Sequence, residues 1–176
     1  MRSGRPEAGE FASYAAEDIA SVAGDDAVAA LTSVAEETTS LFSSLTADIP
    51  HYAPGKWTLK EVLGHLIDDE RIFAYRALCV ARLDPAALPG FDEKAYVAAA
   101  HFESRSIADL LREYHAVRAA TIALFESLMP EEWLRTGTVN GYIASVRGLA
   151  FHIAGHELHH LRIVRERYLE RRRLAG

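Results

Sequence analysis

Apolar residues recur at spacings of three and four along four long stretches of the chain, and no stretch alternates convincingly as a strand would. The first stretch follows the acidic pair Asp25-Asp26. Because a helical turn takes about 3.6 residues, this spacing places the recurring side chains on one helical face. An amphipathic helix is therefore predicted over residues 25–47, with its buried face formed by Leu31, Val34, Thr38, Leu41 and Leu45.

A second helix begins after the proline- and glycine-containing turn at residues 50–56. Thr58 can accept a bond from the backbone at position 61, and the Glu61 side chain can return one, which is the capping-box pattern. Apolar positions continue at helical spacing to about Leu83. The predicted face of this second helix consists of Val62, Leu66, Phe73 and Val80.

Residues 84–105 form a connection that is far longer than an antiparallel helix pair needs. The segment contains Pro85, Pro89 and Gly90, and residues 93–100 could form a short helix within it. A connection of this length can return along the bundle. We therefore expect a crossover that lets the third long helix run parallel to the second.

Two more long helices complete the pattern, and together they predict an all-α four-helix bundle. Ser106 with Asp109 opens the third, and Ser145 is the expected cap of the fourth, which continues to about residue 170. Gly137 and Gly141 interrupt the chain between these helices. Residues 11–22 could add a helical turn or two. The expected organisation is a flexible N-terminus at 1–10 and a single bundle domain at 11–176.

Composition narrows the range of partners. The chain has 176 residues, is 49% apolar and has a net charge of −6. An acidic chain of this kind argues against nucleic acid as the main partner, because binding phosphates needs a basic surface. The single cysteine, Cys79, permits no internal disulfide and fits a reducing cytoplasm. No apolar run is long enough to span a membrane, and residues 1–10 lack the apolar core of a signal peptide, so a cytoplasmic location is expected.

Two histidines of the fourth helix point toward the core. His156 and His160 are four residues apart, which places both imidazoles on one helical face and close enough to share a metal ion. They fall within the apolar stripe of this helix, whereas His152 lies toward its edge. His152 is therefore expected either to contact the ligands rather than the metal or to be a half-exposed histidine at the helix surface.

The second helix supplies a third imidazole. His65 lies at the edge of its apolar face, Asp69 lies inside that face, and Asp68 lies on the other flank of His65. Polar groups beside an apolar stripe are costly unless they are paired. A metal bound by His65, His156 and His160 would satisfy all three imidazoles. Three protein ligands also leave one coordination position for water or substrate, as in catalytic zinc sites.

The same segment matches the H-E-x-x-H pattern of zinc peptidases, in which Glu157 would be the general base. Those enzymes take a third ligand further along the chain. Here Ile163 and Glu166 occupy the positions of the turn glycine and third histidine of one such group. Glu157 is also about 100° from His156 around the helix. We therefore expect Glu157 to form an ion pair between helices or to contact a ligand.

The motifs of the second and fourth helices together resemble the DinB-like family of bacterial damage-inducible proteins. The resemblance extends over roughly residues 10–170. It rests on the segments YAPGKWTLKEVLGH at 52–65, DDER at 68–71, LPGFD at 88–92, GHELHHL at 155–161 and RERY at 165–168.

This resemblance implies a four-helix bundle in up-down-down-up order and a divalent metal, often nickel or zinc, on a histidine triad. Matching the motifs selects His65, His156 and His160. Relatives include transferases and isomerases that use bacillithiol, mycothiol or glutathione. The expected function is activation of a low-molecular-weight thiol for S-transfer to a small-molecule substrate, with Asp68 or Asp69 orienting His65 or accepting a proton. A metal-dependent hydrolase and a non-enzymatic metal-binding stress or interaction protein are the alternatives. A homodimer through a helix face is also expected.

Overall fold

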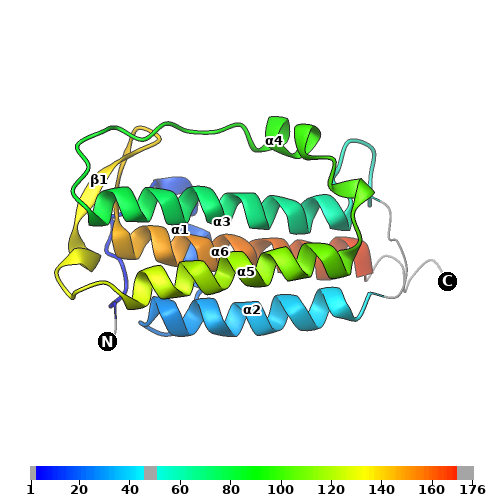
Figure 1. Ribbon diagram of the computed structural model, residues 1–176, viewed down its shortest axis with the longest axis horizontal. Coiled ribbons are helices and arrows are strands. Elements are labelled where there is room, and N and C mark those ends of the chain that lie inside the picture. The colour runs from blue at the N-terminus through cyan, green and yellow to red at the C-terminus, as the bar shows by residue number, and fades with distance from the viewer. Residues whose placement is uncertain (1–2, 46–50, 170–176) are drawn as a thin grey trace.

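Four long helices lie side by side and form the body of the molecule (Figure 1). The computed structural model describes residues 3–45 and 51–169. In Figure 1, α2 and α6 run in one direction and α3 and α5 in the other, so the predicted up-down-down-up bundle is confirmed. The bounds of the bundle helices are α2 Ala27–Ser43, α3 Leu59–Ala81, α5 Ile107–Glu126 and α6 Val146–Ile163.

Side-chain caps determine where these helices begin. Thr58 and Glu61 form the predicted capping box at the start of α3. Ser106 and Ser145 each accept a backbone N–H as the caps of α5 and α6. Each such cap is worth about 1 kcal/mol. The last two residues of the first predicted helix, 46–47, and residue 170 of the fourth lie outside the described residues.

The crossover between α3 and α5 extends along the whole bundle (Figure 1). It contains α4 (Glu93–Ala100), as predicted, followed by the 3₁₀ turn η2 (Phe102–Ser104). Phe102 packs directly on Gly64 of α3, where an added Cβ would lie 2.4 Å from the phenyl ring. This close contact fixes α4 near the first turns of α3.

A β-hairpin joins α5 to α6, and the sequence prediction of no strands was wrong here. After the 3₁₀ turn η3 (Glu132–Leu134), β1 (Thr136–Val139) pairs antiparallel with β2 (Tyr142–Ser145). The turn residues Asn140 and Gly141 have φ values of 51° and 79°. Asn-Gly favours this two-residue turn, and it is the local signal that could have revealed the hairpin. Strands of four residues are too short to show alternation.

The N-terminal segment packs on α6. It contains the 3₁₀ turn η1 (Ser13–Ala15) and the short helix α1 (Ala16–Ser21). The Arg5 guanidinium donates to three backbone carbonyls at distances of 2.7 to 2.8 Å, and Glu10 pairs with Arg147 of α6 at 2.7 Å. Gly155 lets α1 approach α6 closely, since a Cβ there would be 2.4 Å from a backbone oxygen of α1. The flexibility expected for residues 1–10 stays a prediction.

The core consists of two hydrophobic clusters, one toward each end of the bundle. Phe73, Phe125 and Phe151 belong to one cluster, and Leu63 and Leu161 belong to the other. Along α3, α5 and α6, Asp69, Glu70, Arg118, Thr121 and Glu157 lie in sequence between the two clusters, and His65 and His152 lie among the cluster residues nearest to them. This polar layer includes Thr38, His65, Asp69, Glu70, Arg118, Thr121, His152 and Glu157.

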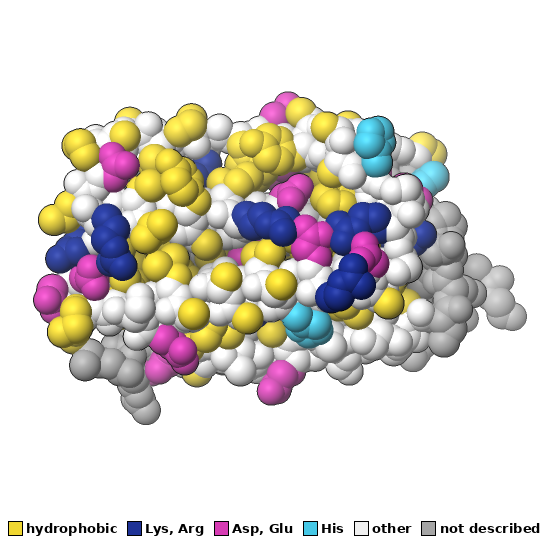
Figure 2. All heavy atoms as spheres, viewed as in Figure 1, with side chains coloured by type: hydrophobic (Ala, Val, Ile, Leu, Met, Phe, Trp, Pro, Cys, Tyr) yellow, Lys and Arg dark blue, Asp and Glu magenta, His cyan; other side chains and the backbone are white. Residues whose placement is uncertain are grey.

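The surface contains charges of both signs close together. Figure 2 shows basic and acidic side chains beside one another on the face that it presents. Ion pairs between bundle helices include Arg71 with Glu113, which join α3 to α5 at 2.7 Å. Across the described residues, every helix is too short or too polar to cross a lipid bilayer.

Candidate metal centre

Three histidines from two helices meet within the polar layer. His65 comes from α3, and His156 and His160 come from consecutive turns of α6. The Nε2 atom of His156 lies 3.2 Å from Nε2 of His65 and 3.2 Å from Nε2 of His160. One ligand atom from each of the three side chains lies within 4.8 Å of the other two. The structure therefore brings together the three residues that the sequence selects as ligands.

Burial keeps two of these imidazoles neutral. His65 is 1% exposed. Burial, assisted by the nearby His156, lowers the pKa of His65 to about 4. Burial likewise lowers the pKa of His160 well below its ordinary value, and His156 and His65 lower it further. At neutral pH both rings therefore retain a nitrogen lone pair, which is the form of histidine that binds metals.

Asp69 orients the third imidazole. Its Oδ2 lies 3.2 Å from Nδ1 of His156. Burial alone would raise the pKa of Asp69, but His156 outweighs burial and lowers it, so the carboxylate is charged. The pKa of His156 is raised, because Asp69 outweighs the opposing effect of burial. A carboxylate on Nδ1 holds the ring in the tautomer that directs the Nε2 lone pair toward the other two histidines.

This pairing differs from the sequence expectation, which placed the carboxylate on His65. Asp69 reaches across from α3 to α6 rather than along its own helix. Asp68 lies on the other side and approaches Arg71 at 3.5 Å, with its side chain 25% exposed. Burial raises the pKa of Asp68, opposed by Arg71. Of the two candidates, only Asp69 contacts a triad histidine among the described contacts.

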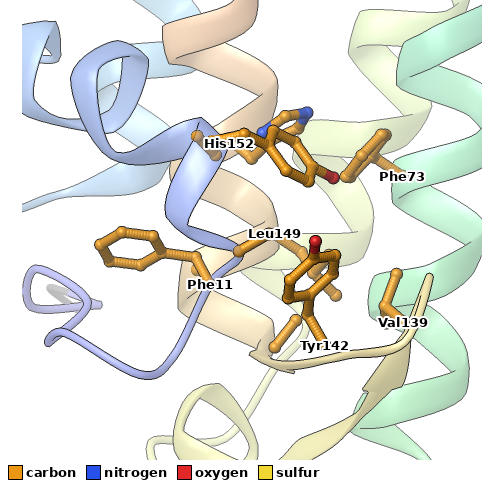
Figure 3. A pocket seen from close by; sticks show the side chains of 11 residues that line it. Phe11, Phe73, Val139, Tyr142, Leu149 and His152 are labelled. Carbon is orange, nitrogen blue, oxygen red and sulfur yellow. The ribbon is translucent and has the colours of Figure 1, made fainter.

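His152 lies beside the triad, as expected for a residue that contacts a ligand. Its ring stacks on His156 at a centroid distance of 5.6 Å and on Phe73 at 4.0 Å. Burial lowers the pKa of His152 to about 4. Figure 3 shows His152 and Phe73 together at one side of a small pocket, with Leu149, Tyr142 and Phe11 further along it. The pocket has a volume of about 20 Å³, room for about one water molecule.

Trp57 packs beside two of the triad imidazoles. Its ring centroid lies 4.7 Å from that of His65 and 6.3 Å from that of His160. Trp57 was not among the site residues predicted from the sequence. A possible signal was its position directly before the capping box, which fixes it at the start of the helix that holds His65.

A larger pocket borders the triad at His160. Its volume is about 380 Å³, and it lies between the 52–57 loop, the start of α3, the crossover helix α4 and the end of α6. His65 is buried, whereas His156 and His160 are partly exposed, and His160 borders this pocket. The lining residues are Tyr52, Gly55, Lys56, Trp57, Val62, Glu93, Lys94, His160, Ile163 and Tyr168.

Glu157 forms the predicted ion pair between helices. It is 2% exposed, pairs with Arg118 and accepts a hydrogen bond from the Tyr114 hydroxyl at 2.5 Å. Arg118 also donates two bonds of 2.9 Å to Glu70 and one of 2.6 Å to the backbone of α2. Because these partners occupy Glu157, the structure gives no support to a peptidase-like general base. Sequence reasoning missed Arg118 and Glu70.

The arrangement of nitrogens fits a divalent cation. Metal–nitrogen bonds of 2.0 to 2.1 Å at tetrahedral angles separate neighbouring ligand nitrogens by about 3.3 Å. The two separations of 3.2 Å centred on His156 agree with this spacing. Imidazole nitrogens suit zinc, nickel, copper and iron. The residues present therefore fit a divalent metal ion, which these three imidazoles would hold beside the pocket that His160 lines.

Fold and site together define a four-helix-bundle protein with a long crossover and a histidine triad between its second and fourth bundle helices. Residues 30–164 match the family model of the DinB superfamily, and the chain belongs to that superfamily. A similar solved structure is YfiT from Bacillus subtilis, described as a probable metal-dependent hydrolase with an unusual four-helix bundle topology. The two chains are 20% identical, with a TM-score of 0.73 over 84% of this chain and 85% of that one. No curated protein matches the chain.

Proposed function

We propose that this protein is a metal-dependent enzyme that activates a low-molecular-weight thiol for transfer to an electrophilic small molecule. The observation that supports this proposal most directly is the convergence of three imidazole nitrogens at the edge of a 380 Å³ pocket. A structural metal site is usually closed by four protein ligands, whereas a catalytic site keeps one position open. The open pocket therefore favours an enzyme over a metal-binding stress or interaction protein.

The residues of the site have separate tasks in this proposal. His65, His156 and His160 would hold the cation, and nickel or zinc suits this set of donors. When bound, the metal would lower the pKa of a coordinated thiol or water and so supply a nucleophile near neutral pH. Asp69 holds His156 in its binding tautomer. Trp57 packs against the imidazoles of His65 and His160 and would hold them in place.

Hydrolysis is the second candidate, and the likeness to YfiT favours it. That protein is described as a probable metal-dependent hydrolase and has the same fold. The same histidine triad would then activate water instead of a thiol. The two candidates share the metal and differ in the nucleophile that enters the pocket.

Elemental analysis tests the metal first. We expect about one nickel or zinc ion per chain in the purified protein and a large loss of metal in a His160→Ala variant. His159→Ala is the matched control, because His159 is the adjacent residue but pairs with Asp18 of α1 at 3.2 Å. Equal metal contents in the two variants would contradict the proposed site.

The reaction is tested with metal-loaded protein. Glutathione, bacillithiol and mycothiol are each incubated with a panel of electrophiles, and consumption of free thiol is followed. A parallel panel of esters, amides and lactams without thiol tests hydrolysis. Thiol conjugation that is lost in His160→Ala and retained in His159→Ala is the expected result. Ester, amide or lactam cleavage without any conjugation would instead favour the hydrolase.

A further inference from the structure

We propose that the pocket beside His160 binds an organic monoanion, a carboxylate attached to an apolar body, with its anionic end at Lys56 and Lys94. Such a ligand would be the substrate of the proposed enzyme, and this role rests on the proposed function. The binding itself requires only the pocket. Three features support the assignment: the apolar wall, the positions of the lysines and the local charge balance.

The wall of the pocket is apolar and held in place. Tyr52 and Tyr168 meet edge to face at a centroid distance of 4.9 Å. The Tyr168 hydroxyl donates to the backbone carbonyl of Trp57, which ties the 52–57 loop to the π-helix η4 (Val164–Leu169) at the end of α6. Val62 and Ile163 add aliphatic surface. Ligand pockets are usually concave and largely apolar, with a few fixed polar groups and a volume of about 300–1,000 Å³, and this pocket agrees.

The lysines are concentrated at this pocket. The chain contains three lysines, Lys56, Lys60 and Lys94, and two of them line the pocket. Within the described part of the chain, neither the Lys56 nor the Lys94 ammonium forms an ion pair or hydrogen bond. Lys60, four residues after Lys56, instead donates to the backbone carbonyl of Glu103 at 3.3 Å. Two unpaired ammonium groups on one pocket, in a chain with a net charge of −6, favour an anionic ligand.

The charges of the side chains that line the pocket favour a ligand with a single negative charge. Among the described residues, Glu93 is the one carboxylate that lines the pocket beside the two lysines, and these three side chains have a combined charge of +1. A phosphate monoester would bring nearly twice the charge of a carboxylate. Lys56 and Lys94 belong to the exposed loop and to α4, whereas His160 belongs to α6. An anion at the lysines would therefore direct the apolar body of the ligand along the aromatic wall toward the histidine triad.

Binding of three probes with one shared apolar body tests the proposal: 4-phenylbutyrate, 4-phenylbutan-1-ol and 4-phenylbutylamine. Affinities are measured by calorimetric titration against zinc-loaded protein and against chelator-treated protein. We expect the carboxylate to bind most tightly and the amine most weakly in both forms. Since exposed ion pairs are worth little individually, Lys56→Gln and Lys94→Gln should each weaken carboxylate binding by about two- to fivefold. Binding of the alcohol should not change.

Lys60→Gln is the matched control, because it removes the same charge from a lysine that is not among the lining residues of the pocket. Equal affinities for the three probes, no measurable binding, or an equal effect of Lys60→Gln and Lys94→Gln would each overturn the assignment. A carboxylate preference that depends on the two lysines and persists in His160→Ala would support the pocket even if the protein held no metal. If the protein binds metal but shows no preference for the carboxylate, the result contradicts the proposed anion site and remains compatible with the proposed function.

Discussion

Replacing Arg118 with methionine tests whether the buried ion network holds the bundle together around the triad. Arg118 is 3% exposed and is the cation that neutralises Glu70 and Glu157, each 2% exposed. Removing the guanidinium deletes its four hydrogen bonds, two to Glu70, one to Glu157 and one to the backbone of α2. Two carboxylates then remain buried without a counter-charge.

The expected loss of stability is large. Removing one partner of a buried ion pair typically destabilises a protein by about 3–5 kcal/mol, because an uncompensated charge remains. A domain of this size has a total unfolding free energy of about 5–15 kcal/mol. Arg118→Met should therefore lower the urea midpoint markedly, as followed by circular dichroism. The pKa of Glu70 is already raised by burial despite Arg118, which shows how unfavourable its charge would become without that cation.

Arg112→Met is the matched control on the same helix. Its side chain is 80% exposed and pairs with Asp109 at the surface. Exposed pairs contribute about 0–1 kcal/mol, so this variant should unfold almost as the wild type does. Adding Glu70→Gln and Glu157→Gln to Arg118→Met should restore much of the loss, since the network then contains no unpaired buried charge. If Arg118→Met and Arg112→Met have the same urea midpoint, the buried-charge argument is wrong.

Three further predictions concern contacts around the site. Gly155→Ala places a methyl 2.4 Å from the backbone of α1 and should destabilise the protein by about 1–3 kcal/mol in urea unfolding. Burial acts to raise the pKa of Glu10, but Arg147 opposes this effect, and the pKa is lowered from its ordinary value of 4.5. The Glu10–Arg147 pair therefore stabilises the folded state above that pH, and its contribution disappears on acidification. Glu10→Gln should therefore increase amide hydrogen exchange in the N-terminal segment at pH 7 and reduce its further increase in acid. Asp69→Asn should weaken zinc affinity about 10- to 100-fold in a chelator competition, and Asp68→Asn should leave it nearly unchanged.

Much of the fold could be predicted because its signals are local. The Thr58 capping box and the Ser106 and Ser145 caps are readable in a few residues, and the structure has helix starts at all three. The length of the crossover also predicted that α3 and α5 run parallel. The π-helix at Val164–Leu169 had no such signal, because helical periodicity does not distinguish it from a continued α-helix.

The sequence predicted which site residues share a face of one helix, because their angular positions follow from the spacing. It could not predict contacts between side chains of different helices. Angles placed His65, His156 and His160 near apolar faces, and the structure brings them together. They could not show that Asp69 reaches His156, because that contact depends on how α3 and α6 pack. Arg118 did leave a trace, since it lies on the apolar face of α5, four residues after Tyr114.

The triad and the ion network are adjacent in sequence but face different groups. His156 belongs to the triad, whereas the next residue, Glu157, pairs with Arg118. Likewise, Asp69 contacts His156, whereas the next residue, Glu70, pairs with Arg118. Neighbouring residues on a helix are about 100° apart, so two short segments can hold both clusters at once. The ion pairs of Arg118 with Glu70 and Glu157 hold α5 against α3 and α6. They therefore also help to set the distance between α3 and α6, and with it the distances between Asp69, His65 and the histidines of α6. Variants of Arg118 that still fold should therefore bind metal more weakly, although Arg118 contacts none of the three histidines in the described structure.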